Sequence, residues 1–156
     1  MLSFIVAFDP NQGIGIRGSL PWHIRDDLKL FKQNTLGKNI VMGQTTYENL
    51  PRKLTDRKIF VVSNDENYHD DEVTIIRDLI PFLQQHQDDE EEYFICGGAS
   101  IYRQSYPYCR KAFISFVKKE YEVDTHFGVF DFDDWYITRE DDYDEFVYRE
   151  LVRRQR

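Results

Sequence analysis

The sequence is poor in cysteine, in basic side chains relative to acidic ones, and in long apolar runs. Its 156 residues include only two cysteines, Cys96 and Cys109, which are too few for a disulfide scaffold or a zinc site. No run approaches the roughly 18 apolar residues of a membrane-spanning helix. The apolar segment 1–8 follows no basic stretch, so it is typical of a buried strand rather than a signal peptide. These absences predict a protein of the reducing cytoplasm, with no membrane partner and no metal.

Acidic residues outnumber basic ones by 28 to 20, which gives a net charge of −8. The excess is uneven, because residues 1–78 carry a net charge of −1 and residues 79–156 carry −7. A nucleic-acid-binding domain would present a basic surface, so we expect no nucleic acid partner. The acidic C-terminal half is typical of a solvated face that aids solubility.

Length and composition are typical of one domain with a substantial core. A chain of this size buries about 70% of the surface of its unfolded form, and 15% of the residues are aromatic. Apolar segments at 2–8, 39–43, 58–63, 73–76 and 93–96 alternate with helical ones, and 112–117, 135–138 and 146–152 follow with few helices between them. We therefore predict a single α/β domain over residues 1–156, with a mostly parallel central sheet, helices on both faces and antiparallel C-terminal strands.

The most informative stretch is the segment 20–31. Pro21 suits the opening of a helix, since its fixed φ fits the first turn and its missing N–H is not needed there. One face of that helix would carry Ile24, Leu28 and Phe31. Asp27 flanks this apolar stripe, and the helix is expected to end near Gly37.

A carboxylate such as that of Asp27, set into an apolar wall, needs a partner, because burying an unpaired charge is very costly. The partner is either internal, such as an arginine, a hydroxyl or a cap, or a ligand that carries N–H donors. Alternatively, Asp27 only complements the helix dipole from the first turn. Taken alone, the purely structural explanations are the more common ones.

A glycine-rich loop over residues 9–19 precedes this helix, and long loops in compact domains are usually functional or disordered. Other candidate groups fall at the carboxyl ends of predicted strands, where open α/β sheets bind ligands. They are Gly43 with Thr45 and Thr46, Ser63 with Asn64, Arg77, and Gly97 with Gly98. Hydroxyls and free N–H groups at helix starts suit a diphosphate, although the sequence has neither a Gly-x-Gly-x-x-Gly nor a Walker pattern.

In order and spacing, four blocks of the chain resemble those of the dihydrofolate reductase family. They are Leu20-Pro21-Trp22 with Asp27-Leu28 and Phe31, the segment 40–48, Gly97-Gly98 with Tyr102, and Asp124-Thr125-His126-Phe127. The resemblance covers nearly the whole chain and implies a dihydrofolate reductase-like fold. It also implies an NADPH-dependent reduction of 7,8-dihydrofolate to tetrahydrofolate, which supports one-carbon metabolism and thymidylate synthesis. We expect a monomer that also binds antifolate inhibitors.

The resemblance implies catalytic roles for Asp27, Trp22 and Leu20. Asp27 would accept hydrogen bonds from a ring nitrogen and the 2-amino group of the pterin, supported by the hydroxyl of Ser115. Trp22 and Asp27 would order the water that delivers a proton. The loop that ends at Leu20 would close over the reacting ring and exclude water, with Asp124 as a latch.

The implied substrate-binding residues surround the pterin and its tail. The main-chain carbonyls of Ile5 and Cys96 would border the amino-bearing edge of the pterin. The aminobenzoyl ring would lie among Leu28, Phe31, Leu50 and Leu54. Arg57 would grip the glutamate carboxylate with its planar guanidinium, helped by Lys32 and Arg52. The alternative for Arg57 is a surface salt bridge, which contributes little.

The implied cofactor is NADPH, with the nicotinamide carboxamide held by backbone groups of Ala7 and Ile14. The full set of expected cofactor contacts is Ala7, Ile14, Gly15, Gly18, Ser19, Gly43, Gln44, Thr45, Thr46, Ser63, Asn64, Arg77, Gly97, Gly98, Ala99, Ser100, Ile101 and Tyr102. Gln44 stands where the family usually has a basic residue that reads the 2′-phosphate, which weakens the inference of NADPH over NADH. Arg77 together with Ser63 could compensate.

Two other functions fit parts of the pattern. One is a reductase of the same fold that acts on another heterocycle, such as a flavin-pathway pyrimidine; Arg57 and the Trp22–Asp27 spacing argue against it. The other is a non-catalytic module whose acidic half docks a basic partner. Such a module would be expected to have lost the site residues, which are present here.

Overall fold

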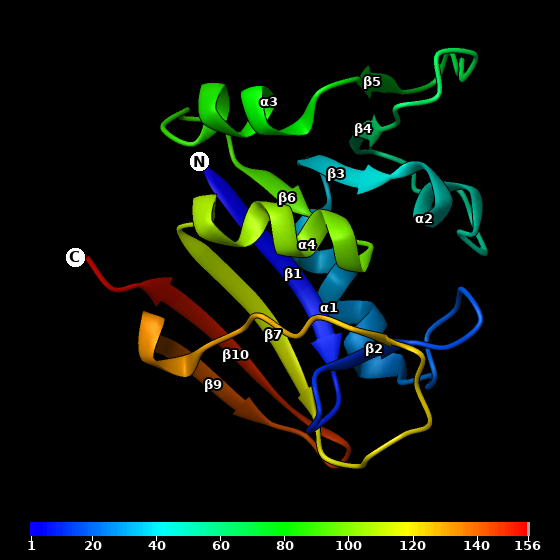
Figure 1. Cartoon of the computed structure of the whole chain (residues 1–156). Coiled ribbons are helices and arrows are strands. Elements are labelled where there is room, and N and C mark those ends of the chain that lie inside the picture. The colour runs from blue at the N-terminus through cyan, green and yellow to red at the C-terminus, as the bar shows by residue number, and fades with distance from the viewer. Residues whose placement is uncertain (156) are drawn as a thin grey trace.

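The computed structural model describes residues 1–155, and its centre is one twisted eight-stranded sheet (Figure 1). The strand order is β5-β4-β3-β6-β1-β7-β10-β9. The first strand, β1 (Leu2–Phe8), lies near the middle and pairs in parallel with β6 (Tyr93–Ile95) and β7 (Lys111–Val117). An apolar strand at the N-terminus therefore becomes the centre of the sheet, as its nearly complete burial requires.

The remaining strands extend the sheet on either side of this centre. β3 (Asn39–Gly43), β4 (Lys58–Val62) and β5 (Thr74–Ile76) continue it in parallel. β10 (Phe146–Arg153) pairs antiparallel with β7, and β9 (Trp135–Asp142) pairs antiparallel with β10. The predicted parallel sheet with antiparallel C-terminal strands is confirmed.

Helices cover both faces of the sheet, as predicted (Figure 1). α1 (Arg25–Thr35) lies on one face, and α3 (Leu79–His86) and α4 (Ala99–Ser105) lie on the other. The short elements are α2 (Gln44–Glu48), the 3-10 turns η1 (Tyr106–Tyr108) and η2 (Phe132–Asp134), and a two-stranded ribbon of β2 (Gly13–Gly15) and β8 (Thr125–His126).

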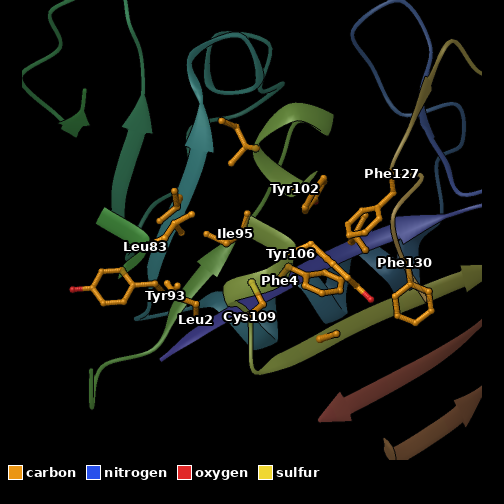
Figure 2. Close-up of a cluster of buried hydrophobic side chains, with 14 of the residues drawn as sticks. Leu2, Phe4, Leu83, Tyr93, Ile95, Tyr102, Tyr106, Cys109, Phe127 and Phe130 are labelled. Carbon is orange, nitrogen blue, oxygen red and sulfur yellow. The ribbon is translucent and has the colours of Figure 1, made fainter. Parts of the chain in front are cut away.

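The larger core cluster lies between the sheet and the α3–α4 layer and is rich in aromatic rings (Figure 2). The ring of Phe4 is 5.2 Å from that of Phe127 and 5.6 Å from that of Trp135, measured between centroids. Side chains alternate along a strand, so the odd-numbered residues of β1 point the other way. Ala7 accordingly packs against the second cluster, which contains Trp22 and Ile24.

The first helix differs from its prediction. α1 begins at Arg25, with Ile24 in extended conformation as its N-cap, so the prediction that Pro21 opens the helix is wrong. The segment before Arg25 is instead irregular, with a bend at Pro21, and it buries Trp22, which is 7% exposed. The helix ends at Thr35, close to the expected stop, and Gly37 follows with φ +75°.

Two further expectations are corrected by the structure. Ile24 is buried, but Leu28 is 42% exposed, so the apolar stripe of α1 does not enter the core along its whole length. The segment 9–19, predicted as a glycine-rich loop, is not loop throughout, because its residues 13–15 form β2, which pairs with β8. Strands of three and two residues carry too little periodicity to be recognised in a sequence.

Candidate active site

Asp27 lies on α1 and meets the hydroxyl of Ser115 on β7. The Ser115 Oγ donates a hydrogen bond of 2.7 Å to the Asp27 Oδ1. Asp27 is half-buried, and burial raises the pKa of its carboxyl, while the bond from Ser115 partly opposes that rise. Within residues 1–155 no lysine, arginine or histidine forms an ion pair with it. Of the internal partners considered, the hydroxyl is therefore the one present, and one carboxylate oxygen accepts no bond from these residues.

Trp22 supplies a second unusual polar group. Its indole N–H is buried and donates to no acceptor among residues 1–155. Its ring packs edge-on against that of Tyr121, with centroids 5.3 Å apart, and it shares a core cluster with Ile24 and Val117. Most buried donors in proteins are hydrogen-bonded, so a buried N–H of this kind fits a ligand or a bound water molecule.

The carboxyl end of β1 presents a further polar edge. The hydroxyl of Tyr102 donates a 2.7 Å hydrogen bond to the carbonyl of Ile5, and burial raises the pKa of that hydroxyl well above its ordinary value, so it stays protonated. Cys96 follows β6, and burial likewise raises the pKa of its thiol. A protonated thiol is a poor nucleophile. The side chain of Cys96 therefore contributes packing at this edge, and its polar contribution comes from its main chain.

Two strand-to-helix turns approach each other closely beside this edge. The N–H of Gly43 donates a 2.9 Å bond to the carbonyl of Gly97, and the Gly97–Gly98 peptide bond is cis. A Cβ on Gly43 would lie 3.3 Å from Ile101, and one on Gly98 would lie 3.2 Å from the hydroxyl oxygen of Thr46. Only glycine fits this approach without displacing a neighbour, and the starts of α2 and α4 are thereby brought together.

Arg57 is held beside the C-terminal turn of α1. Its Nε donates to the hydroxyl of Thr35 at 3.0 Å, and its Nη1 donates to the carbonyl of Thr55 at 3.0 Å. The guanidinium also lies 6.0 Å from the ring centroid of Phe31. Within residues 1–155 no acidic side chain forms a salt bridge with it, so the surface salt bridge considered above does not occur in these residues.

The other predicted substrate contacts differ in exposure. Leu20 and Leu28 are 49% and 42% exposed. Phe31, Leu50 and Leu54 are half-buried, while Lys32 and Arg52 are exposed. Apolar side chains of α1 and of the segment after α2 are thus partly accessible to solvent on the side of the sheet where Arg57 lies.

The residues expected to read a 2′-phosphate are bonded to one another and to the backbone. The buried hydroxyl of Ser63 donates to the Gln44 Oε1 at 2.6 Å. The guanidinium of Arg77 donates to the carbonyls of Ser63, Asp65 and Tyr68. Arg77 therefore braces the loop after β4, and its exposed cation stays next to Ser63 and Asn64.

Asp124, which we expected to act as a latch, contacts the loop that precedes α1. The N–H of Arg17 donates to the Asp124 Oδ2 at 2.9 Å, and this backbone bond lowers the pKa of that carboxyl. Gly18 has φ +80°, and Ile16 and Ser19 exchange backbone hydrogen bonds around it. Sequence reasoning missed Asp9, whose carboxylate joins the same two loops. The spacing of Asp9, Asn11 and Gly13 is the only local signal for it.

These features define a class of protein: a single-domain α/β fold with a half-buried carboxylate on α1, an indole N–H that meets no acceptor among residues 1–155, and two glycine turns at the carboxyl edge of a parallel sheet. The family model for dihydrofolate reductase matches residues 1–151. The chain belongs to the dihydrofolate reductase family.

Individual relatives agree with this assignment. The chain is 39% identical over 129 residues to the dihydrofolate reductase of Mycoplasma genitalium, covering 80% of this chain and 81% of that protein. It is 37% identical over 135 residues to that of Bacillus subtilis, covering 86% and 80%. A structure of dihydrofolate reductase from Enterococcus faecalis, complexed with NADP(H) and RAB-propyl, matches with a TM-score of 0.88 and 27% identity, over 99% of this chain and 97% of that one.

No helix in residues 1–155 has the length and apolarity needed to cross a membrane. No cluster of three or more histidine, cysteine, aspartate or glutamate side chains is arranged there to hold a metal ion.

The raised pKa of Asp27 predicts that this residue lowers stability at neutral pH. A carboxyl with a higher pKa in the folded state binds more protons there, so its contribution to stability falls as pH rises from the unfolded pKa through the folded one. We expect Asp27→Asn, which keeps an oxygen for Ser115, to raise Tm by roughly 2 °C or more at pH 7. The gain should vanish below the unfolded pKa of about 4. Thermal unfolding measured across pH gives the gain in Tm at pH 7 and its loss at low pH. A lower Tm for the variant at pH 7 would contradict the prediction that Asp27 lowers stability at neutral pH.

Proposed function

We propose that this chain reduces 7,8-dihydrofolate to 5,6,7,8-tetrahydrofolate with NADPH. The observation that carries the proposal is the half-buried carboxylate of Asp27, which has the Ser115 hydroxyl as its donor and no cationic partner in residues 1–155. A carboxylate in such surroundings is costly unless donors reach its remaining lone pairs. The pterin offers a ring N–H and an amino group side by side, which match the two oxygens of a carboxylate.

The proton and the hydride reach the pterin by separate routes in this proposal. Asp27 orients the pterin and, together with the free indole N–H of Trp22, orders a water molecule that protonates the ring nitrogen. The raised pKa of Asp27 brings its proton affinity closer to the operating pH, which is the condition for efficient proton transfer. Leu20 closes the site against bulk water.

The residues of the glycine turns fit a dinucleotide cofactor. The close approach of Gly43 to Gly97 leaves the N–H groups at the starts of α2 and α4 without side-chain caps, and such groups suit a diphosphate. The nicotinamide supplies the hydride when the cofactor is bound. The chain positions that ring through backbone groups of Ala7 and Ile14 and holds the phosphates near Thr45, Thr46 and the segment 97–102.

Arg57 completes the substrate site in this proposal. Thr35 and Thr55 fix its guanidinium beside Phe31, which leaves the Nη2 edge for the glutamate carboxylate of the substrate. Leu28, Phe31, Leu50 and Leu54 contact the aminobenzoyl ring, with Lys32 and Arg52 adding positive charge. The same surfaces accept antifolate inhibitors.

We also propose that the enzyme is monomeric and acts in the cytoplasm. All the side chains assigned above come from one chain, so the site needs no second copy. Cys96 and Cys109 are both free thiols, and a reducing compartment keeps thiols in this form.

The central test is consumption of NADPH by the purified protein in the presence of dihydrofolate, with and without an antifolate. We expect turnover that the antifolate abolishes. Asp27→Asn should lower kcat about 100-fold, because the pterin loses its anionic partner and the proton route is impaired. The circular dichroism spectrum serves as the folding control. A variant that turns over at the wild-type rate at neutral pH would refute the role of Asp27.

Arg57→Leu should weaken binding of dihydrofolate about tenfold to a hundredfold, because a charge-assisted bond to a carboxylate is lost. The kcat should change little, since Arg57 lies away from the reacting ring. Thr35→Val is the matched control, because it removes the partner of Nε and keeps the guanidinium. An unchanged Kd for dihydrofolate in the Arg57 variant would count against the carboxylate grip.

The preference for NADPH is expected to depend on Arg77, whose exposed cation lies beside Ser63. Arg77→Met should lower kcat/KM for NADPH about fivefold, the order of one exposed charge pair to a phosphate, and leave kcat/KM for NADH unchanged. Gln44→Arg should act in the opposite direction. Equal kcat/KM values for the two cofactors in the wild-type protein would show that Arg77 and Ser63 do not replace the missing base.

A further inference from the structure

Asp9 is a buried carboxylate that the mechanism above does not use. It follows β1 directly and is 1% exposed. Its Oδ1 accepts backbone hydrogen bonds from Asn11 at 2.9 Å and Gly13 at 2.8 Å, and its Oδ2 accepts one from the N–H of Tyr121 at 3.1 Å. We call this set of three bonds the Asp9 clamp.

The Asp9 clamp does more than close a turn. Backbone bonds already close it, since Asp9 N–H donates to the carbonyl of Gly13 and Gln12 N–H donates to that of Asp9. The Asp9 carboxylate adds two bonds within the turn, from Asn11 and Gly13. Its third bond leaves the turn and reaches Tyr121, which lies 112 positions away in the sequence.

That bond leads to the active site. The ring of Tyr121 packs against Trp22, the residue whose buried indole N–H has no acceptor in residues 1–155. The clamp also holds Gly13, the first residue of β2, tightly in place. A Cβ on Gly13 would lie 2.7 Å from Val123 and 2.9 Å from the Asp9 Oδ1, so the two loops touch at this point.

We propose that Asp9 is a positioning residue that fixes the indole of Trp22 relative to Asp27, acting through the backbone of Tyr121. The proposal rests on the proposed function for its kinetic consequence, because Trp22 matters to turnover only if it orders the proton-donating water. Its structural consequence can be measured without any substrate. The proposal about Asp9 and the proposed function can therefore fail independently of each other.

The structural experiment uses Trp135→Phe as a background, which leaves Trp22 as the sole tryptophan of the two in the chain. Asp9→Asn keeps the size of the side chain but sets an NH2 group against at least one backbone N–H of the clamp. We expect acrylamide to quench Trp22 fluorescence about twofold more strongly, as local opening increases. The control is Asp134→Asn, a buried carboxylate that accepts from Tyr106 and forms none of the three bonds of the clamp; it should leave quenching unchanged.

The kinetic experiment uses the same substitutions without the Trp135 change. Asp9→Asn should lower kcat about tenfold, because small displacements of positioning groups slow the chemical step, while KM for dihydrofolate stays within about twofold. Gly13→Ala, which wedges the loops apart and keeps the carboxylate, should shift quenching and kcat in the same directions. It tests the proposal even if Asp9→Asn fails to fold.

Three results would overturn the proposal: unchanged quenching in both clamp variants, unchanged kcat in both, or equal effects from Asp134→Asn. If quenching increases in the clamp variants but the wild-type protein has no dihydrofolate reductase activity, the proposed function is refuted instead. In that case the link between Asp9 and Trp22 would stand.

Discussion

The hydrogen bond from Ser115 to Asp27 is the contact on which the site depends. It joins α1 to β7 across 88 positions of sequence, and Ser115 is placed by the parallel register that pairs it with Ala7. The bond reaches one oxygen of the Asp27 carboxylate, and the other accepts no hydrogen bond from residues 1–155. The site is therefore costly to the folded protein at neutral pH, because burial opposes the charged form, and this cost is typical of sites that have been selected for binding rather than for stability.

Much of the fold follows from the sequence because its central strands are strongly apolar. The parallel strands and their antiparallel extension were predicted from the alternation of apolar strand-like and helical segments, and the structure confirms them. Boundaries were less accurate at α1, where Pro21 lies at a bend in the irregular segment before the helix. Burial of Trp22 explains that difference, and no local propensity reports such a long-range contact.

The sequence predicted some contacts of the site and not others. Asp27 was identified from the apolar stripe of its helix and Ser115 through the family resemblance, and the structure brings them together. The apolar stripe of α1 suggested that Leu28 would be buried in the core, but Leu28 is exposed. A helix that forms the wall of a binding site keeps part of its apolar face accessible. The Asp9 clamp could not be predicted, since Tyr121 contributes only its backbone N–H and any residue but proline carries that group.

The position of β10 has a consequence for how the chain is completed during synthesis. Although it is the last strand in sequence, β10 lies between β7 and β9 and is paired with both. Until residue 153 leaves the ribosome, β7 keeps an unpaired edge beside the centre of the sheet. Exposed edges of this kind are prone to pairing with other chains, so the nascent protein is vulnerable to misassembly at this edge until β10 has been made.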